Sequence, residues 1–391
     1  MNKYFVWACL AGVFMLSVTS CSEQTMMDQG IHASGEAQRE VQITFHLSVI
    51  SGMQTRGGRP LYSSEALQMV NDMKVYVFKK DANTETFVYD GKSYSIKAFD
   101  NTDTPYDGEG YETHYHTLDT KLADGTYKFL AVGLENDHEE TFSFTPTTTT
   151  TLDAAVLSLK STDIHADEAF SGVSEEVTVS EDRKGFFARI ELKRVVAGVL
   201  GYFKNIPYQV ESNGQMVVVK KVCVELLKKA TQVRLEDRVA STDGLLQPTS
   251  YYRLLTIDLS GASFDSDNNI YISDAVGTEG TPVKVENSFL AGGYALPFDV
   301  GDGQKTMKLV LYGGEPETAL RTYKVQDEIK TAAPVALTEC FSIEADHFYS
   351  LGLKSKDNDT EEDKPIDLSK DQTIKITVDA SWEDIYDITG K

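Results

Sequence analysis

The chain is poor in cysteine, tryptophan and positive charge. Its 391 residues include four cysteines and two tryptophans, and 37 Lys and Arg stand against 60 Asp and Glu, which gives a net charge of −23. A chain this acidic repels a phosphate backbone, so nucleic acid is excluded as a partner. The apolar run near the N-terminus is shorter than the about 20 residues that a membrane-spanning helix needs.

The N-terminal residues 1–20 have the pattern of a cleaved secretory signal peptide. Lys3 supplies the positive start, an apolar run follows, and polar residues return before Cys21. Leu16–Cys21 resembles the lipobox of bacterial lipoproteins, although Val18 stands where a larger apolar residue is usual. The resemblance implies that Cys21 is lipidated, and the alternative is a Cys buried in an N-terminal helix. Residues 21–37 are polar and unpatterned, so we expect a flexible tether.

Two cysteines remain once the signal peptide and Cys21 are set aside. They are Cys223 and Cys340. In an oxidising compartment they could form a disulfide, but a sequence does not show whether two cysteines are close enough to pair. The alternative is two buried thiols in strands.

Most of the chain alternates apolar and polar residues, which is typical of half-buried strands. The first such run, "VQITFHLSVI", places five apolar residues on one face: Val41, Ile43, Phe45, Leu47 and Val49. Similar runs occur at 73–80, 86–99, 125–136, 186–203, 215–227, 251–260, 306–315, 348–356 and 373–382. Asp-Gly and Asn-Gly pairs between these runs predict turns, so we expect antiparallel β-sandwiches. A single helix is predicted at 63–73, from its cap and the spacing of its apolar residues.

The chain is longer than one hydrophobic core normally supports. Removing the 20 residues of the signal from the 391 leaves a chain for which two domains are expected. Residues 157–185 are polar and acidic without sustained alternation, so we place the first domain at 38–182 and the second at 183–391. A further acidic stretch at 354–371 is predicted to be a solvated loop.

Motifs for catalysis or metal binding are missing. The chain has no Gly-x-Ser-x-Gly elbow, His-Glu-x-x-His pair or phosphate-binding glycine loop. His114 and His116 would share one face of a strand, but no third metal ligand can be named. The acidic stretches 100–112 and 265–269 lack the pattern of a calcium loop, so we expect solvated loops there. We therefore expect neither an enzyme nor a metal or other cofactor.

Several segments in order resemble the fimbrillin family of fimbrial subunits from Bacteroidetes-type bacteria. They are the lipobox, the first strand with its loop "SGMQTRGGRP", "MKVYVFKK", "LADGTYKFLAVGLEN", "RIELKRVVAGVLGYF", "FLAGGYALPF" before "TMKLVLYGG", and the ending "IKITVDASWEDIYDI". The resemblance implies an all-β fold of two tandem transthyretin-like, Greek-key β-sandwich domains with few short helices. It also implies a surface-exposed lipoprotein, held in the outer membrane by its lipid or built into a fimbrium.

For stalk subunits, the family implies cleavage by an arginine-specific protease after the first strand. Arg56 is the candidate site because Gly57 and Gly58 follow it in a polar stretch, whereas it could also be an ordinary loop arginine. Cleavage would free a groove that a strand of another fimbrial subunit fills. The C-terminal residues Ile374, Ile376 and Val378 are the candidate donor strand. The alternative makes them the last native strand of the second domain.

A second hypothesis is a surface glycan-binding lipoprotein. Such a protein also consists of β-sandwiches on a lipidated Cys, and it would present an exposed aromatic platform. The mature chain has many tyrosines but only one tryptophan, Trp382, because Trp7 leaves with the signal. This scarcity favours the fimbrial hypothesis, in which other subunits are the partners and host surface ligands are a further option.

Overall fold

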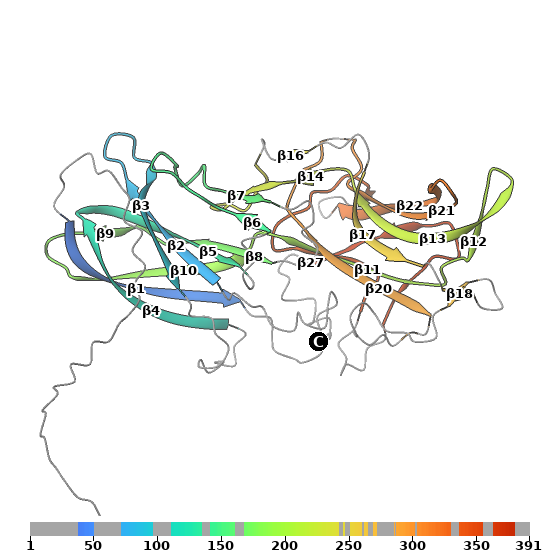
Figure 1. Ribbon diagram of the computed structural model, residues 1–391, viewed down its shortest axis with the longest axis horizontal. Coiled ribbons are helices and arrows are strands. Elements are labelled where there is room, and N and C mark those ends of the chain that lie inside the picture. Colours follow the sequence, from blue (N-terminus) through green and yellow to red (C-terminus); the bar gives the residue numbers. More distant parts are fainter. Residues whose placement is uncertain are drawn as a thin grey trace, which may run out of the picture. The chain divides into compact units, whose positions relative to one another are not determined.

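The computed structural model describes residues 38–50, 72–96, 111–134, 141–160, 168–241, 245–246, 251–259, 262–264, 269–271, 285, 287–301, 303–329, 336–354 and 363–379 (Figure 1). Every regular element in these ranges is a strand. The all-β fold class predicted from the alternation is therefore confirmed. The predicted helix at 63–73 lies outside the described residues except for Asp72 and Met73, and these two belong to a strand instead.

The N-terminal half forms an eight-stranded sheet in the order β3-β2-β5-β8-β10-β1-β4, with β9 paired to β5. Its strands are β1 (Gln38–Ile50), β2 (Asp72–Lys80), β3 (Phe87–Ile96), β4 (Tyr111–Ala123), β5 (Gly125–Leu134), β8 (Ala169–Val173), β9 (Val177–Val179) and β10 (Gly185–Arg194). All neighbours are antiparallel except β1 and β10, which are parallel.

This sheet curls around a core of its own, to which every one of its strands or their flanking turns contributes apolar side chains. The two edge strands approach each other on the open side. Tyr94 of β3 and Thr120 of β4 share a hydroxyl hydrogen bond of 2.6 Å, and Lys92 Nζ donates to the carbonyl of Lys121 at 2.6 Å. Side-chain contacts therefore join β3 and β4 where no backbone ladder does, which gives a sandwich-like arrangement.

The predicted strand 186–203 is two strands that belong to different sheets. β10 ends at Arg194, Val195 and Val196 form a fully buried bend, and β11 (Ala197–Lys204) begins the C-terminal half. Because β10 pairs with β1 and β8, it belongs to the N-terminal sheet, although a boundary at 182 would assign it to the second domain. The change of sheet occurs at Val195–Val196, and the division into domains stays a prediction.

The C-terminal half contains two larger sheets. One has the order β20-β11-β24-β27 with β25 beside β11, and comprises β11, β20 (Ser288–Ala295), β24 (Phe348–Leu351), β25 (Ile366–Asp367) and β27 (Thr377–Asp379). The other has the order β12-β13-β21-β22-β23 with β17 beside β13 and β26 beside β22. It comprises β12 (Gln209–Ser212), β13 (Gln215–Leu226), β17 (Tyr252–Asp258), β21 (Met307–Gly313), β22 (Thr318–Ile329), β23 (Ala336–Thr338) and β26 (Thr373–Lys375).

Two neighbouring strands of the first sheet are almost wholly buried, and a turn in the second sheet has the expected chemistry. All eight residues of β20 are buried, and so are the first seven of β11. The predicted turn at Asn213-Gly214 joins β12 to β13 with φ angles of 53° and 77°, which is the backbone of a two-residue hairpin turn that favours this pair.

Short strands complete the structure. β6 (Phe142–Ser143), β7 (Val156–Leu159) and β15 (Gln232–Arg234) form a three-stranded sheet. Two further pairs are β14 (Lys229–Ala230) with β16 (Leu245–Leu246), and β18 (Ser263–Phe264) with β19 (Ile270–Tyr271). Most of β7, and the whole of β8 and β9, fall within the polar stretch 157–185, where the sequence shows no sustained alternation.

Candidate functional site

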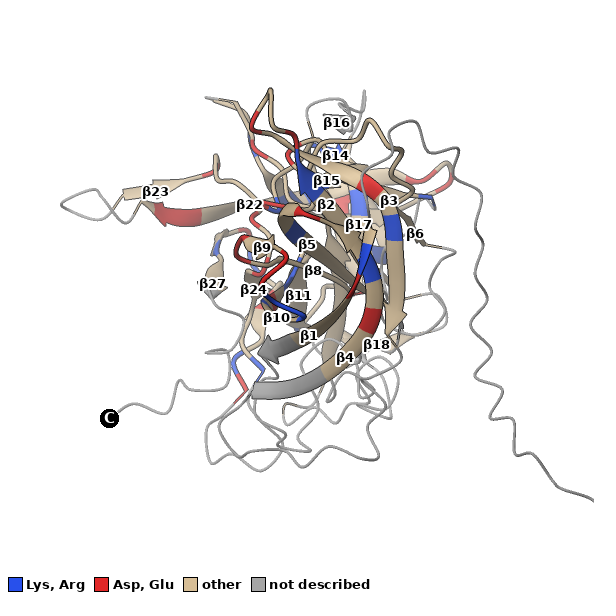
Figure 2. Cartoon of the chain, turned by 90° about the vertical axis from the view of Figure 1, so that its left-hand side faces the viewer, with Lys and Arg blue, Asp and Glu red and all other residues tan. Residues whose placement is uncertain are grey.

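The first strand, β1, lies in the interior of the N-terminal sheet, between β10 and β4 (Figure 2). Residues 42–49 pair in parallel with β10, and the whole strand pairs antiparallel with β4. Removing such a strand would leave unpaired N–H and C=O groups on both neighbours. Backbone hydrogen bonds thus hold β1 on both sides, whereas an edge strand is bonded on one side only.

The inward side chains of β1 are part of the core. Val41 is 4% exposed, and Ile43 and Phe45 are completely buried. The ring of Phe45 meets Phe129 of β5 edge to face, with centroids 5.2 Å apart. Burial of these three side chains contributes on the order of 5–9 kcal/mol before entropic costs. Leu47 and Val49 continue the alternation, but their side chains lie outside the described part of the structure.

Polar contacts fix the start of β1. The Arg39 guanidinium lies with Nε 2.9 Å from Asp124 Oδ1, and Nη2 also hydrogen-bonds Glu181. The hydrogen bond to Glu181 raises the pKa of Arg39. The backbone N–H of Gln42 donates to the carbonyl of Lys184 at 2.8 Å. Because Arg39 and its partners are partly open to solvent, these ion pairs align the strand and add little to its stability.

The candidate donor residues lie in their own chain's sheets. Ile374 is on β26, which pairs with β22, while Val378 is on β27, which pairs with β24. Ile376, between the two strands, is 1% exposed. The segment thus crosses from one C-terminal sheet to the other. This arrangement is the one expected if the segment is the last native strand of the chain. Donation to a neighbouring subunit stays a prediction.

Other predicted positions lie outside the described residues. They are the signal peptide, Cys21 with its tether, Arg56, and the acidic stretches 100–110 and 265–268. In the part of the chain that is described, no helix is long and apolar enough to span a membrane.

The histidine pair and the remaining cysteines can be placed only in part. His116 on β4 stands opposite Phe45 of β1, and partial burial lowers its pKa, whereas the side chain of His114 is outside the described set. No group of three His, Cys, Asp or Glu side chains within the described ranges could hold a metal ion. Cys223 and Cys340 are both free thiols, and burial raises the pKa of Cys223.

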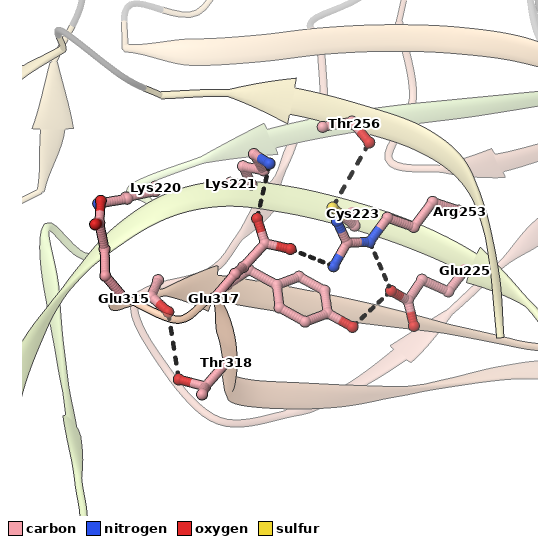
Figure 3. Close-up of polar contacts among 11 residues, drawn as sticks. Lys220, Lys221, Cys223, Glu225, Arg253, Thr256, Glu315, Glu317 and Thr318 are labelled. Carbon is pink, nitrogen blue, oxygen red and sulfur yellow. Dashed lines mark hydrogen bonds and ion pairs between the residues drawn. The ribbon is translucent and has the colours of Figure 1, made fainter. Parts of the chain in front are cut away.

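A polar network that the sequence did not indicate covers the outer face of β13, β17 and β21 (Figure 3). At its centre is Glu225, whose side chain is 4% exposed. The carboxylate accepts a hydrogen bond of 2.6 Å from the Tyr312 hydroxyl, and lies 3.3 Å from Arg253 Nε and 3.1 Å from Lys308 Nζ. Arg253 also stacks over the ring of Tyr312, 4.2 Å from its centroid.

The rim of this network is a second carboxylate, Glu317. It pairs with Lys221 at 2.7 Å and with Arg253 at 2.5 Å, and these hydrogen bonds lower its pKa. Burial and the bond to Glu225 raise the pKa of Tyr312 to about 12. Since every charge has a partner here, the network stabilises the sheet and is not arranged as a reactive site. Alternation along "KKVCVEL" does place Lys221 and Glu225 on one face, which was the only signal available.

Comparison with known protein families identifies the family of this chain. Residues 53–383 match the family model described as fimbrillin-A associated anchor proteins Mfa1 and Mfa2. No curated protein sequence matches the chain.

The solved structures to which the chain is distantly similar include fimbrial proteins. The fimbrial anchor protein Mfa2 from Porphyromonas gingivalis is 12% identical, with 87% of this chain and 98% of that chain covered and a TM-score of 0.38. The tip fimbrial protein Mfa3 from the same organism, with a C-terminal truncation, is 11% identical, with 86% and 99% covered and a TM-score of 0.40. A fimbrial assembly protein from Parabacteroides distasonis is 11% identical, with 88% and 100% covered and a TM-score of 0.37.

These structural likenesses are too distant to carry a functional argument, so the assignment rests on the family model, which spans most of the chain. The chain belongs to the family of fimbrillin-A associated anchor proteins Mfa1 and Mfa2, and is a fimbrial subunit or related cell-adhesion protein.

Proposed function

We propose that this protein is a surface lipoprotein that joins other fimbrial subunits by exchange of β1. The observation that carries the proposal is the position of β1. It is one continuous strand at the start of the described chain, it has partners on both sides, and its inward side chains fill the core. Loss of β1 would open a groove with apolar pockets and two free strand edges, and a strand from another subunit has the shape to fill it.

The register of an incoming strand follows from the same geometry. Val41, Ile43 and Phe45 point inward at every second residue, whereas Gln42 and Thr44 point outward. A strand shifted by one residue would place its polar side chains in the pockets, so only one alternation fits. Subunit partners would therefore be selected by apolar residues at every second position.

Processing and anchoring complete the proposal. Lipid on Cys21 would hold the chain at the outer membrane through the tether 21–37, and cleavage after Arg56 would release β1 from the rest of the chain. A subunit that keeps β1 would serve as an anchor, while a cleaved one would accept a donor strand. Two sandwich domains divide the chain in this proposal, with the change of sheet at Val195–Val196, and the protein acts as a structural component and not as an enzyme.

The test is controlled proteolysis of the mature protein with an arginine-specific protease. We expect cleavage at Arg56 to yield oligomer ladders in size-exclusion chromatography, and Arg56→Ala to remain monomeric. A synthetic peptide of residues 38–50 should suppress the ladders. A control peptide with Ile43 and Phe45 replaced by serine should not, because it cannot fill the pockets. Cleavage at Arg56 that gives soluble monomer alone would refute strand exchange.

Lipidation has a separate test. Cells that express the protein are grown with a labelled fatty acid, which should enter the native protein and not the Cys21→Ser variant. Equal labelling of both proteins would rule out Cys21 as the lipid site.

A further inference from the structure

A hollow of about 660 Å³ opens beside β1 on the outer face of the N-terminal sheet. It is lined by two residues of β1, by β9 with the residue before it, and by the start of β10 with the turn before it: Gln42, Thr44, Glu176, Val177, Thr178, Arg183, Gly185, Phe186 and Phe187. Its volume lies within the range of small-ligand sites in proteins, which is about 300–1,000 Å³. The hollow lies on the opposite face of β1 from Val41, Ile43 and Phe45.

One wall of the hollow is an exposed aromatic ring. Along β10, Phe186 and Ala188 face the core, and Phe187 points outward with 55% of its surface exposed. Phe264, the other exposed phenylalanine in the described residues, lies on β18, outside the hollow. An exposed ring beside a hollow offers a flat apolar surface for a ring-shaped ligand.

Two arginines lie near this ring. Arg183 lines the hollow, and Arg189 lies two residues beyond Phe187 on the same face of β10, at about 7 Å along the strand. Within the described structure, neither guanidinium makes an ion pair or hydrogen bond. By contrast, Arg39 and Arg253 each contact two carboxylates.

The chain as a whole carries an excess of 23 negative charges. Acidic residues are abundant, yet these two arginines have no acidic partner among the described residues. A guanidinium binds a carboxylate through two parallel hydrogen bonds, which makes a free arginine a suitable receptor for a carboxylated ligand.

Polar groups on the remaining walls suit hydroxyl groups. Gln42 donates its amide N–H to Asp119 at 3.1 Å, and its amide oxygen can still accept a bond. The Thr44 hydroxyl shares a 3.0 Å bond with Thr117. Glu176, the one carboxylate among the lining residues, lies 4.0 Å from Lys80 Nζ, which offsets its repulsion of an anion.

We propose that this hollow binds an acidic saccharide. Phe187 packs against the apolar face of a sugar ring, Arg183 and Arg189 bind its carboxylate, and Gln42 and Thr44 bond to its hydroxyls. The net negative charge of the chain does not prevent this, because charges separated by more than about 8 Å are largely screened at physiological salt. The inference goes beyond assembly by strand exchange, since it concerns the outer face of the chain with β1 in place.

The test measures binding of the intact mature protein to immobilised oligogalacturonate, with the methyl ester of the same oligomer as the uncharged control. Sialyllactose, with lactose as its control, forms a second arm that separates host-type sialylated glycans from uronic-acid polysaccharides. We expect an acidic sugar to bind in at least one arm and its uncharged counterpart to bind about tenfold or more weakly.

Variants then locate the site. Phe187→Ala and Arg183→Ala should each weaken binding about tenfold or more, and Phe264→Ala, which removes an equally exposed ring elsewhere, should not. Because Phe187 and Arg183 are exposed, their variants should unfold at the same urea concentration as the native chain. Failure to bind any acidic sugar, equal binding of acid and ester, or full binding by Phe187→Ala would overturn the proposal. None of these results would change the oligomer ladders, so strand exchange is judged separately.

Discussion

Replacing Phe45 by alanine should destabilise the packing of β1 against the core more than an alanine substitution at a neighbouring residue of β1. The ring is fully buried and packs edge to face on Phe129. Truncating a buried phenylalanine to alanine costs about 3–5 kcal/mol, because apolar burial is lost and a cavity remains. Thr44→Ala is the matched control: its side chain points outward and shares one hydrogen bond with Thr117, so we expect a loss of no more than about 1 kcal/mol.

Two measurements separate the effects on the whole protein and on β1. Urea titration followed by circular dichroism gives the free energy of unfolding, and amide hydrogen exchange of residues 38–50 reports the opening of β1 alone. If the loss falls on β1, about 3 kcal/mol would raise the population with β1 detached by about 100-fold. Equal stability losses for Phe45→Ala and Thr44→Ala would refute the packing of Phe45 in the core.

Three further changes test the rest of the structure. Glu225→Gln removes the carboxylate that several donors share, so the free energy of unfolding from urea titration should fall by about 3 kcal/mol, and a loss below about 1 kcal/mol would show that the network is dispensable. Hydrogen bonds to Lys221 and Arg253 lower the pKa of Glu317 from 4.5, so its stabilising contribution is present above that value and is lost as the pH falls through the lower pKa of the folded state. The stability difference between native and Glu317→Gln proteins, measured by urea titration across acidic pH, should therefore shrink toward low pH, and a constant difference would contradict this. Gly172→Ala would place a Cβ 2.2 Å from the backbone oxygen of Glu191, so this variant should be strongly destabilised, and native-like thermal melting would show that β8 and β10 are not so close.

Strands in which apolar residues recur at every second position could be predicted from sequence. The alternation in 73–80 and 125–136 corresponds to β2 and β5 within a few residues, and the first run falls within β1. Side chains at every second position of these strands face a core, so apolar residues recur with a period of two in the sequence. The inward set of β1 was predictable for the same reason.

The strand β8, and pairings between distant segments, could not be predicted. β8, "AFSGV", is buried along nearly its whole length and packs so tightly that Gly172 touches the backbone of β10, so it shows no alternation. The acidic stretch 354–371, expected to be a solvated loop, has a buried ion pair in its described part, with Lys354 Nζ 3.5 Å from Asp363 Oδ1. In a sequence, charged residues that form a buried ion pair cannot be distinguished from charged residues on the surface.

The candidate site depended on contacts that only the fold supplies. Parallel pairing of β1 with β10, which lies far along the chain, has no local sequence signal. The network around Glu225 likewise joins three strands, and the hollow beside Phe187 arises where β1, β9 and β10 meet. The residues in each of these arrangements are of types that are common on exposed strands, so their types alone do not indicate a site.

The most direct test of strand exchange is a reversible covalent link between β1 and β4. The Thr44 and Thr117 hydroxyl oxygens are 3.0 Å apart, so the double variant Thr44→Cys/Thr117→Cys should form a disulfide that keeps β1 in place after cleavage at Arg56. The control Thr126→Cys/Thr178→Cys joins β5 to β9, where the hydroxyl oxygens are 3.5 Å apart, and leaves β1 free. We predict that the oxidised β1–β4 variant stays monomeric and forms oligomers once reduced, and that the control forms oligomers in both states; oligomers from the oxidised β1–β4 variant would contradict the exchange of β1.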